Sequence, residues 1–217
     1  MDRVRVEPPQ TDGETLVGTV EATGSAARFF SGKPFRASYD ESIEGVPASI
    51  LTIPVLAHVC PVAWAAGADV VVDTVDAEFL DGLRRIRSTM LDLYPEFMTG
   101  GSVYCSRPVE RRDETNRATG TGLLFTGGVD STASYVRHWA ESPTLITLRG
   151  WVVGENDREA WQHTRQFVAS FADQRGLETA FVESNMLSFL ATPLLQAHFQ
   201  RYLEGAWYSS VGHGLGL

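Results

Sequence analysis

The chain has 217 residues, and 43% of them are hydrophobic, which fits a globular protein with a buried core. This length allows one large domain or two small ones. The formal net charge of −9 disfavours a large nucleic-acid interface, because such an interface needs a basic face.

Signals for membrane insertion or secretion are missing from the sequence. No run of about 18 apolar residues predicts a transmembrane helix, and the N-terminal residues lack the apolar core of a signal peptide. Cys60 and Cys105 have no metal-binding spacing, and without a secretory signal we expect free thiols rather than a disulfide. These observations predict a cytoplasmic protein.

The first half of the sequence predicts a small mixed α+β domain. Residues 1–14 are polar and rich in proline, and we expect a loose arm. Residues 15–21 and 34–39 have the composition of short strands joined by glycine-rich turns. Residues 47–62 are apolar but interrupted by Pro54 and Pro61, which predicts a buried strand and a loop. Residues 68–73 predict another strand, with the sequence Ala-Asp-Val-Val-Val-Asp.

An amphipathic helix is predicted next, beginning at Asp76, which is a favourable N-cap residue. Its apolar side chains recur at helical spacing: Phe79, Leu83, Ile86 and Met90. Pro95 ends this helix. A strand fragment at 102–105 and an exposed charged linker at 107–117 follow, so we place a domain boundary near 112–118.

This boundary divides the chain into a mixed α+β domain of unknown role at 1–117 and an α/β domain at 118–217. In the second domain, strands alternate with helices: strand 122–126, helix 130–141, strand 144–153, helix from Asp157 to Gly176, strand 178–183 and a helical segment at 186–204. Such alternation predicts a doubly wound parallel sheet with right-handed crossovers. Because only three strands are predicted, we expect a missing C-terminal segment or completion by another chain, as in a homo-oligomer.

Residues 122–132 join the first strand of this domain to the following helix. An apolar run ends at Gly127 and Gly128, which permit a tight turn and a close approach of a ligand to the backbone. Three favourable N-cap residues come directly afterwards: Asp130, Ser131 and Thr132. Free N–H groups at a helix N-terminus bind anions, and phosphate is the usual one.

The six residues at 126–131, Thr-Gly-Gly-Val-Asp-Ser, resemble the Ser-Gly-Gly-x-Asp-Ser signature of the PP-loop ATP pyrophosphatases, an adenine nucleotide alpha hydrolase-like superfamily. Thr126 stands where that family usually has serine, and it keeps the hydroxyl group. The resemblance covers this loop and, more loosely, the order of strands and helices over 121–205. It implies a branch of the superfamily with an additional N-terminal domain.

The resemblance also implies how a nucleotide is bound. The loop of the family holds the β- and γ-phosphates of ATP, and Mg²⁺ bridges their oxygen atoms. In this chain the implied binding residues are Thr126, Gly127, Gly128, Val129, Asp130, Ser131 and Thr132. Asp130 would bind Mg²⁺ or orient the loop, with a plain helix cap as the alternative, and Ser131 is the second expected catalytic residue. By the same analogy adenine would lie near 148–153, where Trp151 is either a stacking partner or a core residue.

The function implied by the resemblance is that of an ATP-dependent adenylating enzyme. It would convert ATP to AMP and pyrophosphate and activate a carbonyl of a small-molecule substrate for C–N bond formation. The alternative is a nucleotide-binding module without turnover. His213, between two glycines, is a weaker candidate for a substrate contact, and a loop histidine without a role is the better interpretation. Residues 118–217 contain no cysteine, so a sulfur relay within this domain is unsupported.

Overall fold

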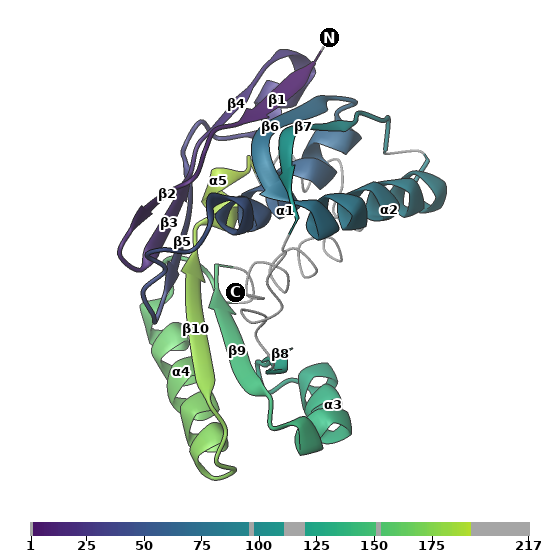
Figure 1. Ribbon diagram of the computed structural model, residues 1–217. Coiled ribbons are helices and arrows are strands. Elements are labelled where there is room, and N and C mark those ends of the chain that lie inside the picture. Colours follow the sequence, from purple (N-terminus) through teal and green to yellow (C-terminus); the bar gives the residue numbers. More distant parts are fainter. Residues whose placement is uncertain (1, 96–97, 111–119, 151–152, 192–217) are drawn as a thin grey trace.

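The computed structural model describes residues 2–95, 98–110, 120–150 and 153–191, and these form a mixed α/β protein with two mixed sheets (Figure 1). The four-stranded sheet has the order β4 (Val20–Ala22), β1 (Arg3–Val6), β6 (Asp69–Asp76) and β7 (Val103–Val109). The six-stranded sheet has the order β2 (Gln10–Asp12), β3 (Thr15–Gly18), β5 (Phe35–Tyr39), β10 (Thr179–Ser184), β9 (Thr144–Arg149) and β8 (Gly122–Leu124).

Helices connect and cover these strands. A short 3-10 helix, η1 (Gly24–Phe29), follows β4, and the helices of the first half are α1 (Ala48–Ala65) and α2 (Ala77–Leu93). The second half contains α3 (Val129–His138), the 3-10 turn η3 (Trp139–Glu141), α4 (Arg158–Asp173) and the short α5 (Met186–Phe189). The predicted helix starts at Asp76 and Asp157 are confirmed, because these carboxylates accept from the N–H groups of Phe79 (2.9 Å) and Ala160 (3.0 Å).

The N-terminal residues are the first place where the sequence prediction was wrong. Instead of forming a loose arm, β1 lies between β4 and β6, antiparallel to the first and parallel to the second. Val4 and Val6 point into the core while Arg3 and Arg5 are exposed, which is the alternation expected of a strand with one buried face. The neighbouring prolines and polar residues concealed this short pattern.

The second wrong prediction concerns residues 47–62, which form most of α1 rather than a strand and a loop. Residues 49–65 are all buried, so the helix has no polar face and the sequence shows no amphipathic period. Pro54 and Pro61 lie inside it. Each proline removes one helical hydrogen bond, and burial of the apolar side chains on all sides outweighs that cost.

The length and composition of α1 would also suit a membrane span, so its burial has to be considered. Within the described residues, α1 is the one helix long and apolar enough to cross a bilayer by length and composition. Pro54 and Pro61 inside it concealed this helix in the sequence. In the structure, 94% of its apolar window is buried inside the protein, which is the environment of a core helix.

The last strand of the first half is longer than predicted. β7 pairs in parallel with β6 as far as the pair Asp76 and Val109, so residues 107–109 belong to the sheet and not to an exposed linker. An ion pair between Arg107 and Asp73 fastens the two strands. The expected free thiols are confirmed, with Cys60 buried in α1 and Cys105 half-buried in β7.

The parallel part of the six-stranded sheet agrees with the sequence. β8, β9 and β10 are adjacent in chain order and parallel to one another. β5 then pairs antiparallel with β10, so the strand order continues into the first half of the chain. The free edge of β10 is therefore covered by β5 of the same chain. The division into two domains stays a prediction.

The helix α4 lies along β9 and β10 (Figure 1) and builds a second core around Phe125, Leu145 and Phe181. Its buried side chains are Trp161, Val168 and Ala172. Phe167 is half exposed, and its ring lies beside Gly127 in the loop after β8. A cation–π contact between Arg165 and Phe181, 4.2 Å from the ring centre, covers the rim of this core.

The buried His58 in α1 makes stability depend on pH. Burial lowers the pKa of His58 to about 4, although a hydrogen bond between Nδ1 and the Pro54 carbonyl opposes the shift. The folded protein therefore excludes a proton that the unfolded chain binds below pH 6.5, and stability falls as the pH drops from about 6.5 towards 4. From the shift we expect a loss of about 2 kcal/mol between pH 7 and pH 5.

Urea unfolding at the two pH values tests this expectation. His58→Asn removes the titrating ring while its amide can still donate to Pro54, so the variant should lose about 2 kcal/mol less than the wild type over this interval. Equal pH dependence in the two proteins would show that His58 is not the responsible group.

Candidate functional site

The candidate loop begins where β8 meets the core. Phe125 is fully buried, its N–H donates to the Ile146 carbonyl (2.8 Å), and its own carbonyl accepts from the buried hydroxyl of Thr147 (2.7 Å). These bonds fix the last residue before the loop against β9. The chain then leaves the carboxyl end of a parallel strand, which is where α/β sheets place their ligands.

The turn itself is made by two glycines with different conformations. Gly127 has φ +77°, and Gly128 is the N-cap of α3, with φ −72° and ψ 171°. The expected N-cap residues Asp130, Ser131 and Thr132 instead lie in the first turn of the helix, so this expectation was wrong. Ser131 instead bridges the loop, because its hydroxyl donates to the Gly128 carbonyl (3.1 Å) and accepts from the Thr126 N–H (3.4 Å).

Free backbone donors are the main chemical feature of the loop. In the described part of the chain, the N–H groups of residues 127–131 have no protein acceptor. Residues 126–130 are exposed, and the positive end of the α3 dipole lies at the same place. An anion with several oxygen atoms is the ligand that satisfies such a set of donors.

Phe167 of α4 explains why the first glycine is required. A Cβ atom on Gly127 would lie 2.2 Å from the ring of Phe167, and the positive φ also disfavours any side chain. A Cβ atom on Gly128 would meet nothing closer than the Thr126 hydroxyl at 3.6 Å. Gly127 is thus a packing requirement, whereas the absence of a side chain at Gly128 leaves space for a ligand.

A hollow of about 580 Å³ opens beside this loop. Its lining comes from the loop and one face of α3: Gly127, Gly128, Val129, Thr132, Ala133, Val136 and Arg137. Thr126, Asp130 and Ser131 are not among these lining residues. Arg137 is a cation that sequence reasoning missed, although its position seven residues after Asp130 puts both on one side of a helix.

Asp130 is the expected magnesium ligand, and it is exposed in the first turn of α3. No group of three or more His, Cys, Asp or Glu side chains capable of holding a metal occurs among the residues that the structure describes. A single carboxylate fits the usual mode of Mg²⁺, which takes one or two protein carboxylates and completes its shell with phosphate oxygens and water. The exposed Asp130 beside free loop amides meets that requirement only together with a polyphosphate.

The titratable side chains of His138 and Asp73 have partners away from the loop. His138 lies on the surface of α3, where its ring bonds to Glu141 (2.7 Å), and this contact is the main cause that lowers the pKa of the Glu141 carboxyl. Asp73 pairs with Arg107 in the other sheet. Trp151 and His213 lie outside the described residues.

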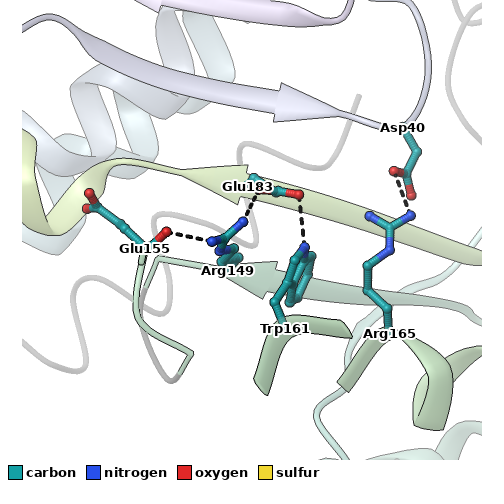
Figure 2. A network of polar contacts seen from close by, with 6 residues as sticks. All are labelled: Asp40, Arg149, Glu155, Trp161, Arg165 and Glu183. Carbon is teal, nitrogen blue, oxygen red and sulfur yellow. Dashed lines mark hydrogen bonds and ion pairs between the residues drawn. The ribbon is translucent and has the colours of Figure 1, made fainter. Parts of the chain in front are cut away.

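A polar network that the sequence did not reveal lies at the ends of the two neighbouring strands. Figure 2 shows Arg149 between Glu183 and Glu155, with Nη1 2.6 Å from the Glu183 carboxylate and Nη2 2.6 Å from the Glu155 carbonyl oxygen. Glu183 also accepts from the indole N–H of Trp161 (2.9 Å). The only sequence signal was a charged residue at the end of an apolar strand in each case.

Comparisons with family models, curated proteins and solved structures returned no match to this chain.

The two glycines of the loop give a matched pair of substitutions. Gly127→Ala should lower the free energy of unfolding by about 2 kcal/mol or more, because the methyl group meets Phe167 and the positive φ is strained. Gly128→Ala has an ordinary backbone conformation and should cost at most about 1 kcal/mol. Chemical denaturation of the two variants measures both values.

A double variant separates the two causes. Adding Phe167→Ala to Gly127→Ala removes the ring, so part of the lost stability should return while the backbone strain remains. Equal stability of Gly127→Ala and Gly128→Ala would contradict this description of the turn.

Proposed function

We propose that the chain is an ATP-dependent adenylating enzyme acting on a small-molecule carboxylate, and that the loop at 126–131 holds the polyphosphate of ATP. The observation that carries this proposal is the run of free N–H groups at residues 127–131, located after a parallel strand and at the start of a helix. Together with the Thr-Gly-Gly-Val-Asp-Ser sequence, this arrangement favours a nucleotide polyphosphate over a simple anion.

The residues around the loop have separate proposed roles. The amides of Gly127 to Ser131 would bind the β- and γ-phosphates, and the exposed hydroxyl of Thr126 is available as a further donor. The hydroxyl of Ser131 would keep the loop in shape, because it already donates to Gly128. Arg137 would neutralise phosphate charge from the wall of the hollow, and Asp130 would bind Mg²⁺, which supplies charge neutralisation.

The proposed reaction has two steps. A carboxylate oxygen of the substrate attacks the α-phosphorus of ATP, the bond to the β-phosphate oxygen breaks, and pyrophosphate leaves with that electron pair. An amine then attacks the activated carbonyl carbon, AMP leaves, and the nitrogen loses its proton to solvent. Catalysis of this kind consists mainly of positioning and charge stabilisation, which a rigid loop of donors provides.

The topology supports a PP-loop type of doubly wound sheet as the finer description of this half of the chain. β8, β9 and β10 follow one another in space, and β8 is the edge strand in the described part of the sheet. The order β8-β9-β10 runs in one direction only, and a doubly wound sheet would need a further strand on the free side of β8, where the strand order would reverse and the ligand would lie. The proposed phosphate loop follows β8. We also propose a cytoplasmic location and a small-molecule partner, with nucleic acid disfavoured by the net charge of −9.

A nucleotide-binding module without turnover is the second candidate function. The observation that favours it is that, among the described residues, Asp130 is the one carboxylate in the loop and the first turn of α3. Release of pyrophosphate from ATP and Mg²⁺, measured with a panel of small carboxylates and ammonium, distinguishes the two candidates. Binding of ATP without formation of AMP or pyrophosphate would support the module.

Asp130→Asn tests the proposed metal ligand. The variant should bind ATP in the presence of Mg²⁺ at least tenfold more weakly, while binding of ATP without Mg²⁺ should change little. Its free energy of unfolding should fall by no more than about 1 kcal/mol, because Asp130 contributes only a charge near the helix dipole. Calorimetric titration measures both affinities.

Two further variants make this test specific. Asp92→Asn, on the exposed surface of α2, is the matched control and should leave all affinities unchanged. Gly128→Ala should weaken ATP binding through its new methyl group while keeping the fold. Unchanged affinity for ATP in both Asp130→Asn and Gly128→Ala would exclude this loop as the nucleotide site.

A further inference from the structure

A second cavity lies at the carboxyl ends of β9 and β10, and it has a volume of about 220 Å³. Six residues line it: Arg36, Arg149, Glu155, Glu183, Ser184 and Asn185. Five of them carry a charged or amide side chain, so the cavity is built for a polar ligand. At roughly 30 Å³ for each water molecule, this volume holds a small organic molecule of a few heavy atoms.

The cations of this cavity retain unused hydrogen-bonding capacity. Arg149 is nearly buried, with 11% of its side chain exposed, and its two terminal nitrogens are occupied by Glu183 and Glu155 (Figure 2). Its Nε–H is buried and has no acceptor in the described structure. Arg36, in β5, forms no side-chain hydrogen bond or ion pair with any described residue. The Arg36 guanidinium can therefore donate to an anionic oxygen of a ligand.

The acidic side of the cavity is only partly occupied. Glu155 accepts from the Ser188 N–H through Oε1 (2.9 Å), and its second oxygen has no partner among the described residues. Glu183 is already satisfied by Arg149 and Trp161. The lining therefore has two positive and two negative groups, which favours a ligand carrying one charge of each sign over a simple anion.

The walls of the cavity are held in place by hydrogen bonds between Asn185 and the main chain of β5 and of Pro34. The side chain of Asn185 accepts from the Arg36 N–H (2.7 Å) and donates to the Pro34 carbonyl (2.9 Å), and its own N–H donates to the Arg36 carbonyl (3.2 Å). These hydrogen bonds fix the backbone of Arg36 beside the end of β10. A charged side chain on a fixed backbone is a suitable first element of a ligand site.

We propose that this cavity binds the zwitterionic head of a small α-amino acid, with its carboxylate on the guanidinium group of Arg36 and its ammonium group on the second carboxylate oxygen of Glu155. Neighbouring strands are about 4.8 Å apart, and Arg149 lies three residues beyond Ile146, the partner of Leu124 at the end of β8, so the ends of β9 and β10 lie roughly 10 to 15 Å from the end of β8. The binding site follows from its own geometry, whereas its role as the pocket for the second substrate rests on the proposed function.

Titration of the full chain with L-alanine, L-serine and L-aspartate, followed by backbone NMR, tests the site without ATP. At least one of the three should bind saturably in the millimolar range. Propionate and ethylamine, which each lack one charged group of alanine, should bind at least tenfold more weakly than alanine does. Absence of saturable binding by all three amino acids would overturn the proposal, and equal binding of propionate would replace it with a simple anion site.

Two conservative variants identify the residues. Arg36→Gln should weaken binding of the best amino acid at least tenfold, and so should Glu155→Gln, whose amide oxygen can still accept from Ser188. Arg85→Gln and Glu159→Gln, on the exposed surfaces of α2 and α4, are the matched controls and should have no effect. Unchanged affinity in both cavity variants would show that the amino acid binds elsewhere.

The two proposals can fail separately. Binding of an amino acid without any release of pyrophosphate would contradict the adenylating function and leave the site intact. Release of pyrophosphate with a carboxylate substrate, unaffected by Arg36→Gln and Glu155→Gln, would contradict the role of this cavity as the pocket for the second substrate. Asp130→Asn should leave the affinity for the amino acid unchanged, because it alters only the phosphate loop.

Discussion

The antiparallel pairing of β5 with β10 is the constraint on which the rest of the structure depends. It joins the antiparallel strands β2, β3 and β5 of the first half of the chain to the parallel strands β10, β9 and β8 of the second half. The paired residues of β5 are Ala37, Ser38 and Tyr39. Asp40 extends the contact by accepting from the Phe181 N–H (3.0 Å) and pairing with Arg165. Without this pairing, Arg36 would not face the end of β10 and the second cavity would have no outer wall.

Local sequence patterns predicted the elements whose burial is one-sided. The helix starts at Asp76 and Asp157, the parallel strands β8 to β10 and the Gly-Gly turn were all predicted, because capping residues, apolar runs and glycines act over a few neighbours. The position of the N-cap at Gly128 was missed. Three favourable cap residues follow it, and sequence alone does not choose between them.

The elements that were missed depend on distant contacts. α1 is apolar on every side, so its sequence contains no period and its prolines look like helix breakers. β1 has two inward valines beside polar neighbours, and only its place between β4 and β6 makes it a strand. Likewise Arg149 and Glu183 become a site only because β9 and β10 bring their ends together, which no spacing along the chain could indicate.

The paired strands β5 and β10 lie far apart in the sequence, and this separation has a consequence for biosynthesis. Arg36 and Asn185, which bond across β5 and β10, are 149 residues apart. At about 5 to 20 residues per second on the ribosome, β5 waits roughly 10 to 30 seconds before its neighbour exists. During that time it presents an open strand edge that invites pairing with other nascent chains, so the protein depends on the cell to shield this edge while translation continues.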